Sequence, residues 1–423
     1  MNARLRALGL SGAFIAVTTL FCTWGFISAN NDPLIVTLRA AFNLSYTQGL
    51  AVQLVSFFAF GLMSLPAAWL SQRLGLLRAI LLALGVMIAG CLLLRAALPW
   101  QSYGAILAAL FVLAVGVNVL QVAANPLAAA LGPQESSHFR LSFAQAFNSL
   151  GVVLGAHFGS RLMLGDRALA DHPAGLTGAA QRAEALGAVD YAYGVMTALL
   201  LALLAFLWLQ RRRIDAAAAG IPPAPNSSVF AALHSRWAIA GAVAIGLYVG
   251  AEVSIGSVMI NFLHHDGIMG LPFERGGELL ANLYWGGALA GRFVGSALLT
   301  RVPAPRLLAI NALCAAALCL LALTGQGALA GYAALAVGLF NSIMFPTIFT
   351  ITLERAGVPQ SATSGLLCLA IAGGGLIPLL VGLIADSTSL ELAFAVPALA
   401  YALIACFALS ALRRPGRGSA LPS

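Results

Sequence analysis

Apolar stretches of about 20 residues recur along almost the whole chain, separated by shorter polar or glycine-containing segments. An α-helix needs a stretch of that length to cross the hydrocarbon core of a bilayer. The stretches do not show the strict alternation of apolar and polar residues that marks the strands of a membrane barrel. The pattern therefore predicts an all-α integral membrane protein with twelve transmembrane helices.

One polar segment near the middle divides the predicted spans into two sets of six. It reads RRRIDAAAAGIPPAPNSSVFAALHSR and contains three prolines, a composition typical of a linker. We expect an N-terminal six-helix half over residues 1–210, a cytoplasmic linker over 211–236 and a C-terminal six-helix half over 237–423. The polar segment 165–190, with a short helix at its end, is expected to form the longest outer loop.

Composition agrees with membrane insertion and explains the positive charge. Hydrophobic residues make up 61% of the chain, and the mean hydropathy is +0.93, so a soluble monomer is excluded. The net charge of +8 comes from 22 arginines, with no lysine. On the loops that follow even-numbered helices we place Arg73, Arg78, Arg140, Arg211, Arg212, Arg213, Arg236, Arg292, Arg301, Arg306 and Arg355. This bias predicts a membrane protein with both termini cytoplasmic, and not a nucleic-acid-binding protein.

Carboxamides form a polar stripe on each of two neighbouring spans. At helical spacing the stripes consist of Asn118, Gln121 and Asn125 around an expected kink at Pro126, and of Gln145 and Asn148. A carboxamide donates and accepts hydrogen bonds without carrying charge, which suits an uncharged ligand rich in hydroxyls, such as a sugar. Helix packing is the alternative role for such residues. We expect the two stripes to face one cavity and one or two of their members to be structural.

The first span, from about Ser11 to Ala40, contains Asp32 directly before Pro33. A proline inside a span frees backbone groups, which is tolerated where the backbone faces protein or a water-filled cavity. Trp24, Ser28 and Asp32 share one helix face, where an aromatic ring and a carboxylate could hold a sugar. The alternative is a solvated Asp32 at the outer membrane interface.

The second half places Glu252 in the middle of the seventh span, one turn after Tyr248. An ionised glutamate at that depth is costly, so it should be paired or protonated part of the time. His264 and His265, at the outer end of this span, are interpreted as interfacial residues and not as metal ligands. The six cysteines are interpreted as small buried hydrophobic residues.

Both halves contain spans interrupted by proline. The fourth span is expected to break at Pro126 and leads to LGPQESS, and the tenth is expected to break at Pro346 and leads to AGVPQSATS. Interrupted spans at corresponding positions point to a midplane site between repeats. The candidate substrate-binding residues are Trp24, Asn31, Gln53, Gln121, Asn125, Gln145, Asn148, Tyr248, Asn282, Trp285 and Asn341, and the candidate ion-coupling residues are Asp32 and Glu252.

Several segments in both halves resemble one known family. WGFISANND, LQVAANP, LGP, RLSFAQAFNSLG, YVGAEVSIGS and FPTIFT resemble the fucose–proton symporter family of the major facilitator superfamily, and YVGAEVSIGS is most similar to its bacterial glucose/galactose transporter branch. The resemblance implies the major facilitator fold and alternating access. It also implies a critical role for Asp32 and sugar contacts from Gln145 and Asn148. Gln121 stands where the family's fourth-helix motif has an acid, which leaves Glu252 as the second ionisable candidate.

These observations predict a secondary active transporter that imports a hexose by cation-coupled symport. The hexose is expected to be glucose- or galactose-like, or N-acetylglucosamine, and the co-transported ion is H⁺ or Na⁺. The alternatives are a fucose–proton symporter and a proton-driven exporter of small molecules. A membrane enzyme would need clustered acids or a metal site, and a sensor would need an attached signalling domain. No cofactor is expected, and the expected partners are the sugar and the lipid bilayer around a monomer.

The topology can be tested by cysteine labelling. A single cysteine placed in the 165–190 loop of a cysteine-free variant should react with a membrane-impermeant thiol reagent from outside, because the arginine bias places that loop in the periplasm. A cysteine in the 211–236 linker should react only after the membrane is opened. Labelling of the 165–190 loop only from inside would show that the helix count is wrong.

Overall fold

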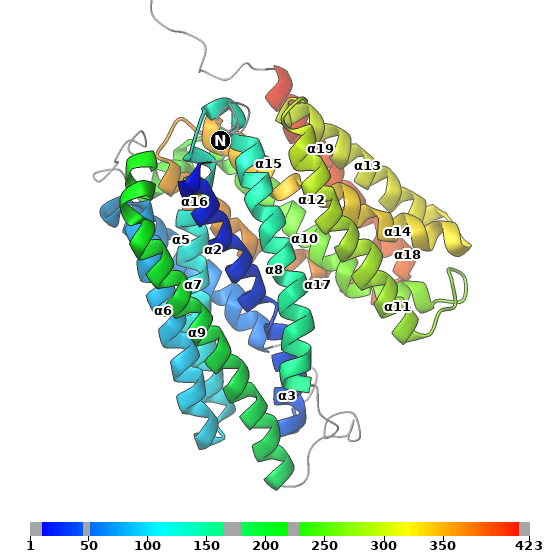
Figure 1. Ribbon diagram of the computed structural model, residues 1–423. Coiled ribbons are helices and arrows are strands. Elements are labelled where there is room, and N and C mark those ends of the chain that lie inside the picture. Colours follow the sequence, from blue (N-terminus) through cyan, green and yellow to red (C-terminus); the bar gives the residue numbers. More distant parts are fainter. Residues whose placement is uncertain (1–10, 45–50, 165–178, 219–227, 414–423) are drawn as a thin grey trace, which may run out of the picture. The chain divides into compact units, whose positions relative to one another are not determined.

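The structure, a computed structural model, describes residues 11–44, 51–164, 179–218 and 228–413 (Figure 1). These residues form helices, and the described ranges contain no strand. Ten helices in them are long and apolar enough to cross a membrane. Two further helical segments, 137–164 and 273–298, occupy the places of the fifth and eighth predicted spans. The prediction of an all-α membrane protein is confirmed.

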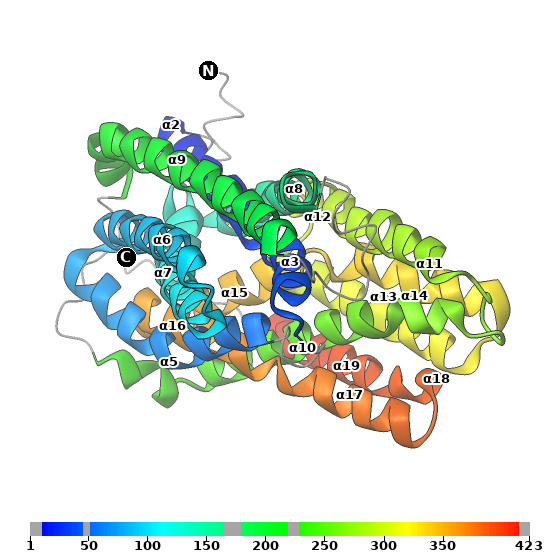
Figure 2. The same cartoon turned by 90° about the horizontal axis from the view of Figure 1, so that it is seen from below.

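The first six spans account for the N-terminal half of the sequence. They are α2 (Gly12–Ser28) with α3 (Asn31–Phe42), α5 (Ala51–Leu74), α6 (Leu76–Ala97), α7 (Tyr103–Ala130), α8 (Ser137–Leu164) and α9 (Ala179–Ala218). Within this set, α6 packs against both α7 and α9 (Figure 2). Short 3₁₀ turns lie at η1 (Leu98–Trp100) and η2 (Gln134–Ser136).

The remaining spans follow the 3₁₀ segment η3 (Val229–His234). They are α10 (Arg236–His264); α11 (Phe273–Leu279) with the π-helix η4 (Leu280–Trp285) and α12 (Gly286–Leu298); α13 (Ala304–Thr324); α14 (Gly327–Asn341) with α15 (Met344–Arg355); α16 (Gln360–Gly373) with α17 (Leu376–Ser387); and α18 (Leu390–Ala393) with α19 (Ala395–Arg413). Three of these spans therefore consist of two helical pieces separated by a short interruption, and the eighth contains a π-helix.

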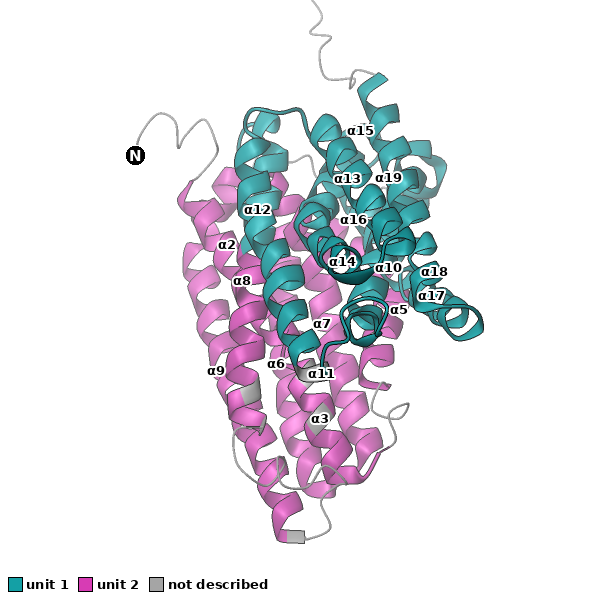
Figure 3. Cartoon of the chain, turned by 90° about the vertical axis from the view of Figure 1, so that its right-hand side faces the viewer, with its two compact units in different colours: residues 1–9, 132–146, 227–423 teal, residues 10–131, 147–226 magenta. Residues whose placement is uncertain are grey.

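The chain divides into two compact units (Figure 3). Unit 1 contains residues 1–9, 132–146 and 227–423, and unit 2 contains residues 10–131 and 147–226. One boundary falls inside α8, whose first turns pack with helices of the second half of the sequence. The expected division at 210 and 236 stays a prediction.

Helix α9 is longer than the sequence analysis predicted. It begins at Ala179, within the expected outer loop, and continues to Ala218, within the expected linker. The segment before the sixth span is rich in alanine, which favours helix, and Arg95 of α6 pairs with Asp190 at 2.8 Å. The prediction of a separate short helix at the end of the outer loop is therefore wrong, because this segment is continuous with the sixth span. Residues 165–178 and 219–227 lie outside the described residues.

Four prolines each occupy the third position of a helical piece that follows an interruption. They are Pro33 in α3, Pro346 in α15, Pro378 in α17 and Pro397 in α19. A proline cannot donate to the carbonyl four residues earlier and its ring clashes with that carbonyl, whereas it is well tolerated in a helix's first turn. The interruptions therefore lie three to four residues before the prolines.

Pro126 behaves differently from these four. Helix α7 continues through it to Ala130, so the predicted break at Pro126 is wrong. Proline removes one hydrogen bond from a helix interior, and the residues around Pro126 are buried on all sides of the helix. Close packing keeps the backbone helical there.

Of the arginines that the sequence analysis placed in loops, Arg301 alone lies outside the helices, and two of the others, Arg140 and Arg292, lie away from the helix ends that adjoin the loops. Arg140 is fully buried in α8 and donates to the carbonyls of Gly132 and Pro133 and to the Ser136 hydroxyl. Arg292 lies in the middle of α12.

The six cysteines are free, but only Cys91, Cys319 and Cys368 are buried and Cys406 is exposed. The expectation that all of them are buried is wrong.

A row of glycines brings α2 and α8 into backbone contact within unit 2. A Cβ on Gly151 would lie 1.9 Å from the Cys22 carbonyl oxygen, and one on Gly155 would lie 2.2 Å from that of Phe26. Gly159, one turn further, packs against Asn30. Small residues four apart are the usual means of close helix packing in membranes. This seam fixes α2 up to its interruption.

Alanine substitution tests the seam. Gly155→Ala should lower the thermal unfolding midpoint of the purified protein, because the new methyl group overlaps the Phe26 carbonyl and the helices must separate. Gly187→Ala in α9 is the matched control, since its Cβ meets no atom within 4 Å and alanine favours helix over glycine. Equal midpoints for the two variants would contradict the close contact.

Candidate functional site

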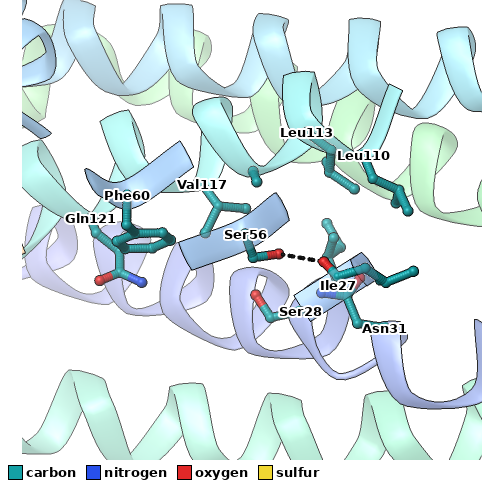
Figure 4. Close-up of a pocket in the computed structure, with 11 residues that line it drawn as sticks. Ile27, Ser28, Asn31, Ser56, Phe60, Leu110, Leu113, Val117 and Gln121 are labelled. Carbon is teal, nitrogen blue, oxygen red and sulfur yellow. Dashed lines mark hydrogen bonds between the residues drawn. The ribbon is translucent and has the colours of Figure 1, made fainter. Parts of the chain in front are cut away.

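Unit 2 contains a pocket where the first span is interrupted. Its volume is about 190 Å³, and it lies between α2–α3, α5 and α7. Its lining consists of Ile27, Ser28, Asn31, Val52, Ser56, Phe60, Leu110, Leu113, Ala114, Val117 and Gln121. Figure 4 shows Gln121 beside Phe60 at one end, Asn31 near the other end, and Ser28 and Ser56 between them.

The interruption of the first span lies next to this pocket. Helix α2 ends at Ser28 and α3 begins at Asn31, so both residues that flank the break line the pocket. Pro33 cannot donate to the Ala29 carbonyl. Hydroxyls and carboxamides beside apolar side chains suit a small, uncharged molecule with several hydroxyls.

The structure separates the candidates on the first two spans. Asn31 lines the pocket, whereas Trp24 is buried and packs on Phe21 with ring centroids 5.6 Å apart. Gln53 is exposed on α5, and its neighbour Val52 is the residue that lines the pocket. Asp32 lies in the first turn of α3, and its side chain lies outside the described residues.

The carboxamide stripes also divide by environment. Gln121 lines the pocket, whereas Asn118 donates to the Ser64 hydroxyl of α5 at 2.8 Å. Asn148 donates to the Phe21 carbonyl of α2 at 3.1 Å, and Asn125 is fully buried. Asn118 and Asn148 therefore tie helices together in this structure. A common cavity for both stripes stays a prediction.

Unit 1 contains a buried polar network around Glu252. The Tyr248 hydroxyl donates to the Glu252 carboxylate at 2.8 Å, and the Tyr284 hydroxyl donates to the Glu252 main-chain carbonyl at 3.0 Å. Asn341 donates in turn to the Tyr284 hydroxyl at 3.1 Å. Tyr284, a residue that the sequence analysis missed, therefore connects the seventh, eighth and tenth spans.

The π-helix η4 determines which residues of the eighth span point inward. Tyr284 is fully buried, whereas Asn282 is exposed and Trp285 is 42% exposed. The Trp285 ring packs at 5.0 Å on Tyr284 and lies over Gly256 of α10, where a Cβ would come within 3.2 Å. Short π-helical turns are frequent at functional sites, and no sequence motif used above indicates one.

Arg292 is a second residue that the sequence analysis missed as a site residue. Its Nε donates to the Ser342 carbonyl at 3.0 Å, and one terminal nitrogen donates to the Gln145 carbonyl at 3.3 Å. Gln145 is itself only 4% exposed. A basic residue between glycines reads equally well as the start of a loop, which is why its position was not recognised.

A third cluster connects α8 with α15 in unit 1. Ser137 donates to Glu354 at 2.6 Å, and the His138 Nε2 lies 3.3 Å from the same carboxylate. The other His138 ring nitrogen is hydrogen-bonded to Thr350. At the C-terminal end of α10, His265 lies 3.4 Å from Glu391. The described residues contain no group of three or more histidine, cysteine, aspartate or glutamate side chains that could hold a metal ion.

Comparison with known proteins places these features in a family. The model of the Major Facilitator Superfamily matches residues 9–372. The glucose/galactose transporter of Brucella abortus is 40% identical over 397 residues, covering 94% of this chain and 93% of the relative. The L-fucose-proton symporter of Escherichia coli is 30% identical over 410 residues, covering 93% and 92%. A crystal structure of the transporter FucP in the outward conformation superposes with a TM-score of 0.84 at 26% identity, covering 95% and 99%.

The two kinds of carboxamide can be distinguished by stability measurements. Asn118→Ala should lower the thermal unfolding midpoint, because it removes a buried hydrogen bond to Ser64 worth about 1 kcal/mol. Gln121→Ala should leave the midpoint almost unchanged, because that side chain lines a pocket. Ser64→Ala combined with Asn118→Ala should cost less than the sum of the single losses. Greater destabilisation by Gln121→Ala than by Asn118→Ala would contradict these roles.

Proposed function

Because the chain belongs to the Major Facilitator Superfamily, we propose that it is a secondary active transporter that imports a hexose by proton-coupled symport. The observation that carries the proposal is the pocket at the interruption of the first span, with Ser28, Asn31, Ser56 and Gln121 on its wall. The relatives are transporters rather than enzymes.

Glucose or galactose is the proposed substrate. The relative with 40% identity is a glucose/galactose transporter, whereas the fucose–proton symporter is 30% identical. The pocket presents hydroxyl and carboxamide groups beside the Phe60 ring, a combination suited to a sugar, whose hydroxyls need partners and whose C–H face packs on an aromatic ring. N-acetylglucosamine and fucose are the other sugars to compare.

The proposed sugar ligands in unit 2 are Asn31 and Gln121, joined by Ser28 and Ser56. Trp24, Gln53, Asn125 and Asn148 remain proposals from the sequence, although Trp24 and Asn125 are buried and Asn148 bonds to α2. In unit 1, Gln145, Tyr248, Asn282, Trp285 and Asn341 remain proposed ligands. The exposed Asn282 and Trp285 are the most accessible of these in the described structure.

Asp32 and Glu252 are the proposed coupling residues. A symporter needs a group whose charge differs between its loaded and empty forms. Glu252 accepts a hydrogen bond from Tyr248, and Asp32 follows the interruption beside the pocket. Proton coupling agrees with the named activity of the fucose–proton symporter, while Na⁺ coupling is the alternative that the uptake experiment separates.

The cellular setting follows from the membrane fold. The relatives are bacterial proteins, and the arginine distribution favours the inner membrane with both termini in the cytoplasm. We propose that the protein works as a monomer.

A proton-driven exporter is less well supported, because an exporter would more often present a large apolar pocket. The pocket in unit 2 combines a small volume with four hydrogen-bonding side chains.

Uptake into proteoliposomes tests the proposed function. Labelled glucose, galactose, fucose and N-acetylglucosamine should each be offered with a proton gradient or a sodium gradient imposed separately, at a fixed membrane potential. Glucose or galactose should accumulate with an inward proton gradient. Accumulation driven by Na⁺ alone would identify Na⁺ rather than the proton as the coupled ion. Absence of uptake for all four sugars would overturn the hexose assignment.

Two variants test the coupling residues. Asp32→Asn should abolish accumulation against a gradient. Glu252→Gln, which resembles the protonated carboxyl, should retain sugar binding and exchange but lose concentrative uptake, since it can no longer release a proton. If Glu252→Gln still concentrates sugar with an unchanged pH dependence, Glu252 is not a coupling residue.

A further inference from the structure

Arg292 is held against the tenth span by two glycines on its own helix. A Cβ on Gly291 would lie 2.5 Å from the Leu339 carbonyl oxygen, and one on Gly295 would lie 2.2 Å from the Ile343 side chain. Side chains at either position would force α12 away from the interruption between α14 and α15. The glycines therefore allow the Arg292 guanidinium to reach backbone at that interruption.

The backbone group that Arg292 reaches is one that a proline leaves without a helical donor. Pro346 stands four residues after Ser342 and has no N–H to give to the Ser342 carbonyl. The Arg292 Nε donates to this carbonyl at 3.0 Å. An unsatisfied carbonyl within a membrane is costly, so the arginine replaces the missing helical hydrogen bond.

The same guanidinium contacts two other elements. A terminal nitrogen donates to the Gln145 main-chain carbonyl of α8 at 3.3 Å. The guanidinium also lies near Tyr248, whose hydroxyl donates to Glu252, so that its positive charge acts on the Glu252 carboxylate. Polar contacts thus connect Glu252 through Tyr248 and Arg292 to the main chain of Gln145, a proposed sugar ligand.

Few other ionisable groups surround this carboxyl. Tyr248 comes from its own helix, Tyr284 and Arg292 come from the eighth span, and Tyr401 comes from α19. Among the described residues that interact with Glu252, Arg292 carries the positive charge. Two opposite charges in such a buried setting compensate each other, and removing one leaves the other uncompensated.

We propose that Arg292 is a positioning residue that transmits the charge state of Glu252 to α8 at Gln145 and to the interruption before Pro346. An ionised Glu252 holds the guanidinium through charge and through Tyr248, and protonation of Glu252 weakens that hold. The directional hydrogen bonds to the Gln145 and Ser342 carbonyls then change with the charge on Glu252. In its consequence for sugar transport, this inference rests on the proposed function.

A double-mutant cycle on thermal unfolding tests the pair without any sugar. Arg292→Gln and Glu252→Gln should each lower the unfolding midpoint of the purified protein by about 5 °C or more. The double variant should recover at least half of the summed loss, because neither charge is left alone. Arg301→Gln, an exposed arginine in the turn after α12, is the matched control and should not change the midpoint. Additive losses in the double variant overturn the pairing.

Sugar exchange between compartments at equal pH tests the transmission. The exchange rate is measured as a function of pH, and the pH-dependent change that disappears in Glu252→Gln is assigned to Glu252. In Arg292→Gln the midpoint of this change should move to higher pH by about one pH unit or more, because the neighbouring positive charge is gone. Arg292→Lys keeps that charge and should restore the wild-type midpoint of the pH profile. Its exchange should stay slower than that of the wild type, since lysine cannot bond two carbonyls in the fixed geometry of a guanidinium.

If the midpoint of the pH profile is unchanged in Arg292→Gln, or if Arg292→Lys exchanges sugar at the full wild-type rate, the positioning role is overturned. If the wild-type protein exchanges none of the four sugars, the proposed function fails, and the unfolding cycle still decides whether Arg292 and Glu252 are paired. The two failures are therefore distinguishable.

Discussion

The structure depends on one constraint, which is that backbone N–H and C=O groups inside a bilayer must find partners within the protein. Continuous helices meet this requirement by themselves. An interruption in a span can persist only where side chains, water or a ligand satisfy the freed groups. The interruptions before Pro33 and Pro346 are two such places, and hydrogen-bonding side chains lie at both.

The two interruptions are satisfied in different ways. At the first span, the break lies beside a pocket with Ser28, Asn31 and Gln121 on its wall, so hydrogen-bonding side chains there remain available to a ligand. At the tenth span, the Ser342 carbonyl accepts a hydrogen bond from Arg292, so the protein itself supplies the partner. The first arrangement is suited to binding, and the second ties the backbone to a charged group that can respond to protonation of Glu252.

Much of the fold could be predicted because apolar length and helical spacing are properties of neighbouring residues. The span pattern and the interruptions near Pro33 and Pro346 follow from local sequence. Pro126 shows the limit of such rules, since a proline inside a tightly packed helix need not break it. The alanine-rich start of α9 shows another limit, because a polar helix and a polar loop have similar composition.

The site was less predictable because its members are defined by partners distant in sequence. Asn118 and Gln121 are both carboxamides on α7, yet one bonds to Ser64 and the other faces a pocket. Arg292 could be recognised as an intramembrane residue only once α12 was seen to continue through it. Tyr284 depends on a π-helix that shifts the register of the eighth span, and local sequence carried no sign of that shift.

Sugar-dependent proton movement is the most direct test of hexose–proton symport by this protein. Proteoliposomes loaded with a pH-sensitive dye, with no imposed ion gradient and with the membrane potential clamped, should acidify internally when glucose or galactose is added outside. Glu252→Gln should take up sugar down its gradient without that acidification. Sugar entry with no change in internal pH in the wild-type protein, in the presence or absence of Na⁺, would contradict proton symport.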